Sequence, residues 1–458
     1  MTSVLLIYPY FHPSRDWSIF RFPPLGLGYI ASALIRAGYE VDILDCTFLK
    51  KEETFYKALR TAADVVGIYA MVSMQGNARE FARHLRKRCR LLIAGGPLPT
   101  CDPESFLDAF DIVVTGEGER TIVQVLEADK IGCDLETIPG IVFRKGKIGV
   151  AGNPEGKIVH TPPRPLEPDL DGIPLPTREL LPNQKYIEFW KKKGVPATTS
   201  VMTTRGCPFS CDFCSNAVFG NSYRERSVVN VIDEVEHALS LGYQRIHFAD
   251  DVFTLKKDRV VRFCEEIMGR NLHFAWECLG RVDSIDASLA GKMKKAGCDR
   301  IFFGIESGND AVLKMMNKNI TVEKARRAVY AAHEAGIKTG AFLMLGYPGE
   351  TDETILNSIR FAGSLPLDYL SYTVPYPLPG TALYGRTKDK VTKEWENPGG
   401  LLTDHSLIFK TDFSETKLKF ALLKGQSQFI LRKKLGNVVS PLLKPCEALS
   451  DLVFKLLK

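Results

Sequence analysis

Short hydrophobic runs alternate with helical patterns through the first third of the chain. The segments 25–37 and 77–88 have the apolar spacing of amphipathic helices. Runs rich in branched residues predict strands at 4–8, 40–44, 65–69, 91–94 and 112–115. Because helical crossovers separate these strands, they predict a doubly wound, Rossmann-like parallel sheet in an α/β protein.

The same alternation returns after residue 197. Helices are predicted at 228–240 and 322–335, among others. Six strands are predicted at 200–203, 245–248, 274–277, 300–304, 339–345 and 369–374. Six βα units predict a partial (β/α)6 TIM barrel, whose ligands would bind at the C-terminal ends of the strands.

The pattern loosens between these two regions, where six prolines crowd residues 162–176. Such a stretch is typical of an extended linker. The last sixty or so residues have a polar and basic helical pattern. We therefore expect a first domain over 1–150, a proline-rich linker over 151–197, a barrel over 198–395 and a small helical domain over 396–458.

The composition is that of a globular protein with several domains: 458 residues, 45% hydrophobic and 25% charged. A net charge of +6, carried by scattered basic residues, does not demand a nucleic-acid partner, and none is expected. The sequence shows no signal peptide and no eighteen-residue apolar run, so no transmembrane segment is expected. Several of the eleven cysteines lie in apolar runs, which favours a reducing, cytoplasmic location.

Three cysteines follow the first predicted barrel strand at C-x3-C-x2-C spacing: Cys207, Cys211 and Cys214. Thiolates at this spacing can bind three irons of a 4Fe–4S cluster and leave the fourth iron without a protein ligand. A structural zinc site would need a fourth Cys or His at motif spacing, and none lies nearby. The pattern therefore predicts an iron–sulfur cluster with one open iron.

With Phe213 before the last cysteine, on the first loop of a predicted barrel, the motif resembles that of the radical S-adenosylmethionine superfamily. The resemblance implies that Cys207, Cys211 and Cys214 ligate the cluster and that Phe213 packs beside the adenine. It also implies that S-adenosylmethionine chelates the open iron. An electron from an external donor would then cleave it to a 5′-deoxyadenosyl radical.

Later strand ends extend the resemblance. Asp250 and Asp251 stand where the family holds the methionine amino group, although the family's usual motif is Gly-Gly-Glu. By resemblance Glu306 reaches the ribose hydroxyls with Ser307 beside it, and Gly346 lies near the adenine. Each segment also has a simpler explanation: a solvated acidic loop for Asp250 and Asp251, a helix N-cap for Glu306 and Ser307, and a plain turn for Gly346.

Arg281 also resembles a recurrent arginine of this family. It could pair with the bound carboxylate, and an ordinary structural ion pair is an equal alternative. Tyr347 and Tyr376, at late strand ends, are candidate catalytic residues on the substrate side, and packing explains them equally well.

Glycine-rich turns follow strands of the first domain, but neither G-x-G-x-x-G after the first strand nor a P-loop is present. A doubly wound domain with these turns before a radical barrel resembles the cobalamin-binding group of the superfamily, the class B radical methyltransferases. With no D-x-H-x-x-G pattern, we do not expect His12 to ligate cobalt. The resemblance implies that cobalamin contacts Tyr8, Gly26, Ser73, Gly95, Gly96, Gly116, Glu117 and Gly118.

The two resemblances together imply a C-methyltransferase. One S-adenosylmethionine would methylate cob(I)alamin, and a second would give the radical that abstracts a substrate hydrogen before methyl transfer. The alternatives are a cobalamin-dependent radical cyclase or ring-rearranging enzyme, and a non-catalytic iron–sulfur and corrinoid sensor. The substrate stays open: a peptide or protein, a lipid or a small molecule. The basic C-terminal helices could guide an acidic peptide, a protein or an anionic lipid, and a solvated helix face is the simpler explanation.

Overall fold

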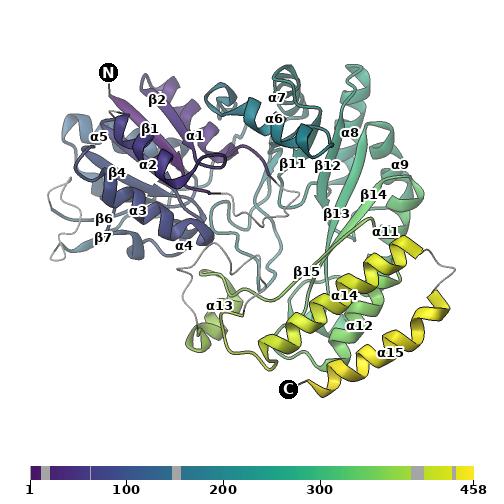
Figure 1. Cartoon of the computed structure of the whole chain (residues 1–458). Coiled ribbons are helices and arrows are strands. Elements are labelled where there is room, and N and C mark those ends of the chain that lie inside the picture. The colour runs from purple at the N-terminus through teal and green to yellow at the C-terminus, as the bar shows by residue number, and fades with distance from the viewer. Residues whose placement is uncertain are drawn as a thin grey trace.

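A computed structural model describes residues 2–11, 21–61, 63–146, 156–392, 407–435 and 440–457. Two α/β units lie side by side, and a pair of helices packs on the second unit, remote from the first (Figure 1). The first unit holds the N-terminus. The second holds the predicted barrel.

The first unit is built on a seven-stranded sheet in the order β2-β1-β3-β4-β5-β6-β7. The strands β2, β1, β3, β4 and β5 run parallel, whereas β6 and β7 add antiparallel pairs at one edge. The strands are β1 (Ser3–Tyr8), β2 (Glu40–Asp45), β3 (Val65–Tyr69), β4 (Leu91–Gly95), β5 (Ile112–Val114), β6 (Ile141–Arg144) and β7 (Ile158–His160). The five predicted strands are confirmed, and the two antiparallel ones were missed.

Alternate residues of the central strands point to opposite faces of this sheet. Leu5 and Ile7 join one core with α2 (Lys51–Arg60) and α3 (Gln75–Leu85). Val4 and Leu6 join the other core with α1 (Leu25–Arg36) and α5 (Gly118–Ile131). Both faces are therefore buried under helices, as the continuous hydrophobic runs require, and the doubly wound fold is confirmed.

The second unit is a six-stranded, wholly parallel sheet in the order β15-β14-β13-β12-β11-β8. Its strands are β8 (Thr198–Val201), β11 (Arg245–Phe248), β12 (Ala275–Gly280), β13 (Cys298–Glu306), β14 (Lys338–Met344) and β15 (Tyr369–Thr373). Its helices are α7 (Val228–Ser240), α8 (Lys257–Gly269), α9 (Ala287–Lys295), α10 (Asp310–Met315), α11 (Val322–Glu334) and α12 (Asp352–Gly363). Because β8 and β15 are both edge strands, the barrel is partial, as predicted.

The range 151–197, expected to be an extended linker, is only partly so. The stretch around residues 162–176 has neither helix nor strand. β7, however, pairs with β6 of the first sheet, and Asn183–Lys192 forms the helix α6. This helix is anchored because the buried Tyr186 hydroxyl donates to Asp45 Oδ2 at 2.7 Å. The prolines thus mark only the middle of this range, and the domain limits at 150, 197 and 395 stay predictions.

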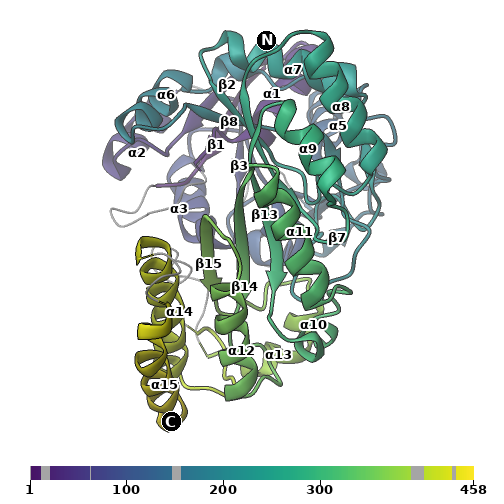
Figure 2. The same cartoon turned by 90° about the vertical axis from the view of Figure 1, so that its right-hand side faces the viewer.

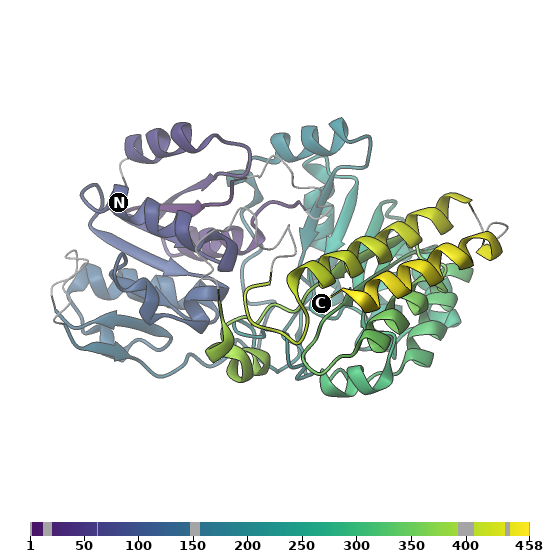
Figure 3. The same cartoon turned by 60° about the horizontal axis from the view of Figure 1, so that its bottom comes forward.

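The helices α14 (Glu415–Leu435) and α15 (Ser440–Leu456) form an antiparallel pair on the outside of the barrel (Figures 2 and 3). α14 packs along α12 and the edge strand β15. Lys417 of α14 pairs with Asp352 at the start of α12, at 2.9 Å. Within the part of the chain that the structure describes, no helix has both the length and the apolar character of a membrane span.

Candidate active site

The three motif cysteines lie on the loop that follows the first barrel strand. A short antiparallel ribbon, β9 (Thr204–Arg205) with β10 (Arg224–Glu225), closes this loop at its base. Gly206 has φ +82°, and a Cβ there would collide with the Ser222 carbonyl oxygen, so the turn before the first cysteine requires glycine. Cys207 is buried, Cys211 is half-buried and Cys214 is exposed, and all three are free thiols.

Neighbouring elements hold the cysteine loop in place. Asn317 donates from Nδ2 to the Ser210 carbonyl oxygen at 2.7 Å. Arg386 of α13 (Ala382–Thr387) pairs with Asp212 at 2.8 Å and donates to the Tyr347 hydroxyl at 2.8 Å. The Tyr347 hydroxyl thus serves to hold the loop, which speaks against a catalytic role for Tyr347. Tyr376 is half-buried against the barrel core.

Two cations face the cysteine loop. The Arg281 guanidinium stacks over the Phe209 ring at 3.6 Å, and Lys318 Nζ lies 5.8 Å from the centre of the Phe213 ring. Burial raises the pKa of the Cys211 thiol, and the charges of Lys318 and Arg281 oppose that rise. Three free thiols on one loop beside fixed cations fit an anionic iron–sulfur cluster. No group of Cys, His, Asp or Glu side chains among the described residues converges on a single metal ion.

Glu306 ends β13 in a strained backbone. Its φ of +66° is unusual for a residue other than glycine, and the β13–β14 register shifts at this point. The carboxylate is nearly buried and pairs with Lys318 Nζ at 3.0 Å. Backbone strain of this kind clusters at active sites, ligand-binding sites and switch regions. Ribose binding by Glu306 stays a prediction.

The two adjacent aspartates after β11 have different environments. Asp250 is buried, and its Oδ1 accepts from the Thr203 and Thr204 amides at 2.6 and 3.0 Å. Its Oδ2 accepts from the Thr203 hydroxyl at 2.5 Å. Both oxygens therefore fix the backbone before the cysteine loop. The exposed Asp251 is the better candidate for a ligand amino group.

Two other predicted contacts have structural partners. Arg281 forms a bidentate pair with Asp283, with both bonds at 2.9 Å, which is the structural ion pair left open above. The buried Ser307 hydroxyl lies 3.1 Å from that of Ser358 and accepts from the Asn309 amide. Their roles toward S-adenosylmethionine stay predictions, and the described contacts explain both residues without it.

Glu350 organises the turn that contains Gly346, and the sequence patterns did not single it out. Its Oε2 accepts from the Gly346 and Tyr347 amides at 2.8 and 2.9 Å. Burial raises the pKa of Glu350 to about 7. Gly346 itself has φ +86° and faces the Leu418 side chain of α14, so the C-terminal helices pack directly behind this turn.

A cavity of about 770 Å³ lies between the two units. Barrel residues on its wall include Ser200 of β8, Met202 just after β8 and Ala249 just after β11. His12 lies outside the described residues. All eight residues predicted to contact cobalamin line this cavity: Tyr8, Gly26, Ser73, Gly95, Gly96, Gly116, Glu117 and Gly118. The structure gathers them in one place, and cobalamin binding by them stays a prediction.

His247 is a polar residue on the cavity wall that sequence reasoning missed. It sits in β11 between Ile246 and Phe248, which point into the barrel core. Its Nδ1 lies 3.1 Å from Glu277 Oε1, and its ring stacks on Phe22 at 4.7 Å. The alternation of this strand could have revealed it, because a histidine between two core residues must face the other side of the sheet.

Glu117 joins the glycine turn of the first unit to the cysteine loop. Arg205, two residues before Cys207, donates to Glu117 at 2.9 Å and to Glu119 at 2.6 Å. Arg224 also pairs with Glu117, at 2.9 Å. Although burial acts in the opposite direction, hydrogen bonds from Arg224 and Arg205 hold the pKa of Glu117 below its usual value. Glu117 therefore links the two units through ion pairs. Because these pairs occupy its carboxylate, they compete with a direct contact between Glu117 and cobalamin.

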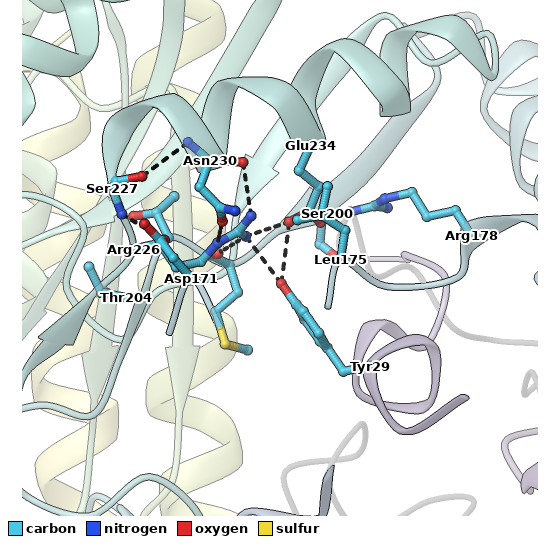
Figure 4. Close-up of polar contacts among 12 residues, drawn as sticks. Tyr29, Asp171, Leu175, Arg178, Ser200, Thr204, Arg226, Ser227, Asn230 and Glu234 are labelled. Carbon is cyan, nitrogen blue, oxygen red and sulfur yellow. Dashed lines mark hydrogen bonds and ion pairs between the residues drawn. The ribbon is translucent and has the colours of Figure 1, made fainter. Parts of the chain in front are cut away.

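A second polar contact between the units surrounds Glu234 of α7 (Figure 4). The fully buried carboxylate pairs with Arg178 and with Arg226. Tyr29 of α1 donates its hydroxyl to Glu234 at 3.3 Å and accepts from Arg226 at 3.1 Å. One carboxylate thus connects the first unit, the linker and the barrel beside the cavity.

Replacing Gly95 with Leu is expected to weaken cobalamin binding by roughly 1–3 kcal/mol, the usual cost of overpacking. A Cβ at Gly95 meets nothing within 4 Å, so the new side chain would extend into the cavity without disturbing the strand. Gly291→Leu, at an equally open position on α9, is the matched control. Titration of cobalamin followed by its absorbance measures both, and an unchanged affinity in Gly95→Leu would contradict the assignment.

Comparison with known proteins gives two family matches. Residues 201–362 match the radical SAM superfamily, and residues 19–126 match the B12 binding domain. An uncharacterized methyltransferase of Pyrococcus horikoshii is 36% identical over 90% of this chain and 89% of its own length. The anaerobic magnesium-protoporphyrin IX monomethyl ester cyclase of Rubrivivax gelatinosus is 29% identical over 85% of this chain and 70% of its own.

A solved structure has the same fold. The radical S-adenosylmethionine methyltransferase TsrM from Kitasatospora setae, determined with cobalamin and a [4Fe-4S] cluster bound, superimposes with a TM-score of 0.68. The match covers 85% of this chain and 75% of that one at 20% identity. The predicted order of a doubly wound domain followed by a partial barrel is thereby confirmed.

Proposed function

This chain belongs to the radical S-adenosylmethionine superfamily, in its cobalamin-dependent methyltransferase group, and on that premise we propose that it methylates an unactivated carbon. Its cofactors are a 4Fe–4S cluster, S-adenosylmethionine and cobalamin. When bound, the cluster and S-adenosylmethionine supply a radical that abstracts hydrogen, and cobalamin supplies a methyl group.

The observation that supports methyl transfer best is the cavity shared by the two units. Its wall combines the glycine turns of the first unit with Ser200 of β8, the strand that precedes the cysteine loop, and His247 of β11. A radical source in the barrel and a methyl carrier in the first unit would meet at this boundary. Holding both reactants in one site lowers the entropic cost of their encounter.

The protein's own residues have defined tasks in this proposal. Cys207, Cys211 and Cys214 hold the cluster. Glu306 and Asp251 bind polar groups of S-adenosylmethionine at the strand ends. The bridge from Arg205 to Glu117 fixes the cysteine loop against the glycine turn, so the two cofactor sites keep a constant separation.

Ring formation without methyl transfer is the second candidate, because the Rubrivivax gelatinosus relative is a cyclase. It requires the same cluster and the same radical. The two candidates differ in whether a methyl group ends in the product.

Product analysis with a deuterated methyl donor separates them. The anaerobically reduced holoenzyme is incubated with candidate substrates of each class: peptide, lipid and small molecule. Methyl transfer predicts a product heavier by the labelled methyl group, with the label passing through preformed methylcobalamin. An unlabelled, cyclised product would favour the second candidate. The proposal includes an external electron donor and a cytoplasmic location.

Glu306→Ala is expected to weaken S-adenosylmethionine binding by roughly 1–3 kcal/mol, because it leaves ribose hydroxyls without a partner. Anaerobic titration of the reconstituted protein measures this change. Glu323→Ala, at an exposed carboxylate on α11, should bind as the unmodified protein does. If the Glu306 variant bound S-adenosylmethionine as tightly as the unmodified protein, Glu306 would not be part of the binding site.

A further inference from the structure

The outer helix of the C-terminal pair carries an exposed row of large apolar side chains. Leu449, Leu452, Val453 and Leu456 are spaced at i, i+3, i+4 and i+7, which places them on one face of α15. Leu449 is 64% exposed and Leu456 is 73% exposed. We call these four residues the apolar stripe. Among the described residues, nearly half of the exposed large apolar side chains lie on α14 and α15.

The opposite face of α15 is firmly attached to the protein. Phe454 is fully buried. Asp451 pairs with Lys424 of α14 and with Arg360 of α12, both at 2.7 Å. Because one face is anchored by packing and ion pairs, the apolar stripe is a fixed feature of the surface.

Positive charge is concentrated in the same region. The segment 407–458 contains ten basic and four acidic residues, so its net charge of +6 equals that of the whole chain. The rest of the chain is therefore neutral overall. Lys434 of α14 and Lys444 of α15 lie exposed, and Lys455, which pairs with Glu353 at 3.3 Å, lies exposed beside the stripe. Part of this charge is paired with carboxylates, and the remaining excess of positive charge attracts an anionic partner and repels a second copy of the same surface.

A groove of about 360 Å³ lies at the open edge of the barrel, beside the inner helix of the C-terminal pair. It runs between β15 and α14, and its wall includes Ser371, Leu422 and Leu423. The buried Tyr372 hydroxyl on its wall has no hydrogen-bond partner among the described residues. The leucines of this groove fit part of an apolar molecule at the edge of the barrel.

We propose that the apolar stripe docks the protein on the surface of an anionic lipid membrane and that the substrate is a membrane lipid. An amphipathic helix with leucines on one face and lysines beside them binds at a lipid interface through apolar burial and attraction to anionic headgroups. The substrate class rests on the proposed function, whereas the docking itself does not.

Co-sedimentation of the holoenzyme with lipid vesicles tests the docking. Vesicles of phosphatidylglycerol and phosphatidylcholine are compared with vesicles of phosphatidylcholine alone. The triple variant Leu449→Ser, Leu452→Ser, Leu456→Ser should bind the anionic vesicles at least about tenfold more weakly, because three leucines no longer enter the lipid. The triple variant Ile131→Ser, Val229→Ser, Tyr330→Ser, which removes exposed apolar residues elsewhere, is the matched control and should bind normally. Unchanged bound cobalamin and circular dichroism confirm that both variants fold.

Equal binding of the stripe variant and the control variant would overturn the proposal. So would sedimentation-velocity data showing a dimer that the stripe variant dissociates, because the stripe would then be an interface between copies. Vesicle binding involves no turnover, so its failure leaves methyl transfer standing. Conversely, if the vesicle-bound enzyme methylated a water-soluble peptide and no lipid, that result would contradict a lipid substrate. It would leave the proposed membrane docking standing.

Discussion

Cys207→Ala is expected to abolish reductive cleavage of S-adenosylmethionine. In the proposed function the Cys207 thiolate is one of three cluster ligands, and its loss would remove the single open iron on which chelation of S-adenosylmethionine depends. The measurement is formation of 5′-deoxyadenosine by the anaerobically reconstituted protein with a strong reductant. Cys211→Ala and Cys214→Ala should give the same result.

Cys298→Ala is the control for this experiment. Cys298 is fully buried in the barrel core, away from the cysteine loop, so its replacement should lower stability and leave cleavage intact. Full cleavage activity in Cys207→Ala would show that the cluster is bound elsewhere.

Glu234→Ala should destabilise the protein by about 3–5 kcal/mol, because it leaves two buried arginines without their counter-ion. Arg178 and Arg226 both pair with this carboxylate, and each is nearly inaccessible to solvent. Since Tyr29 of the first unit shares the network, the loss should also loosen the contact between the units. Denaturant-induced unfolding measures the first effect, and susceptibility of the linker to proteolysis measures the second.

Glu236, on the same helix, pairs with Arg270 at the surface, so Glu236→Ala should cost no more than about 1 kcal/mol. If both variants lost equally little stability, the buried network would not hold the units together.

The strands of both sheets could be predicted because each is a short run of branched residues followed by a polar turn. β1, β3 and β11 agree with the sequence pattern to within one residue. β6 and β7 were missed because they are short, antiparallel and lie beside the proline-rich stretch, where the βα alternation stops. The helix α6 was missed because it also lies beside the proline-rich stretch.

Sequence alone could predict only those site residues that belong to a recognisable motif. The cysteine spacing identified the loop, and the glycine turns identified the residues that line the cavity. The role of Glu117 could not be predicted, because its partner Arg205 lies 88 positions away in the sequence. The role of Asp250 could not be predicted either, because its carboxylate accepts hydrogen bonds from the Thr203 and Thr204 amides, which are distant in the sequence.

We propose that this one chain uses S-adenosylmethionine in two ways at a shared site: to methylate cobalamin and to form the radical. The most direct test counts both by-products from anaerobically reduced holoenzyme loaded with a known amount of cob(I)alamin, and needs no substrate. We predict one S-adenosylhomocysteine per bound cobalamin, together with 5′-deoxyadenosine that is absent in Cys207→Ala. Formation of 5′-deoxyadenosine with no S-adenosylhomocysteine, although cobalamin is bound, would contradict methyl transfer.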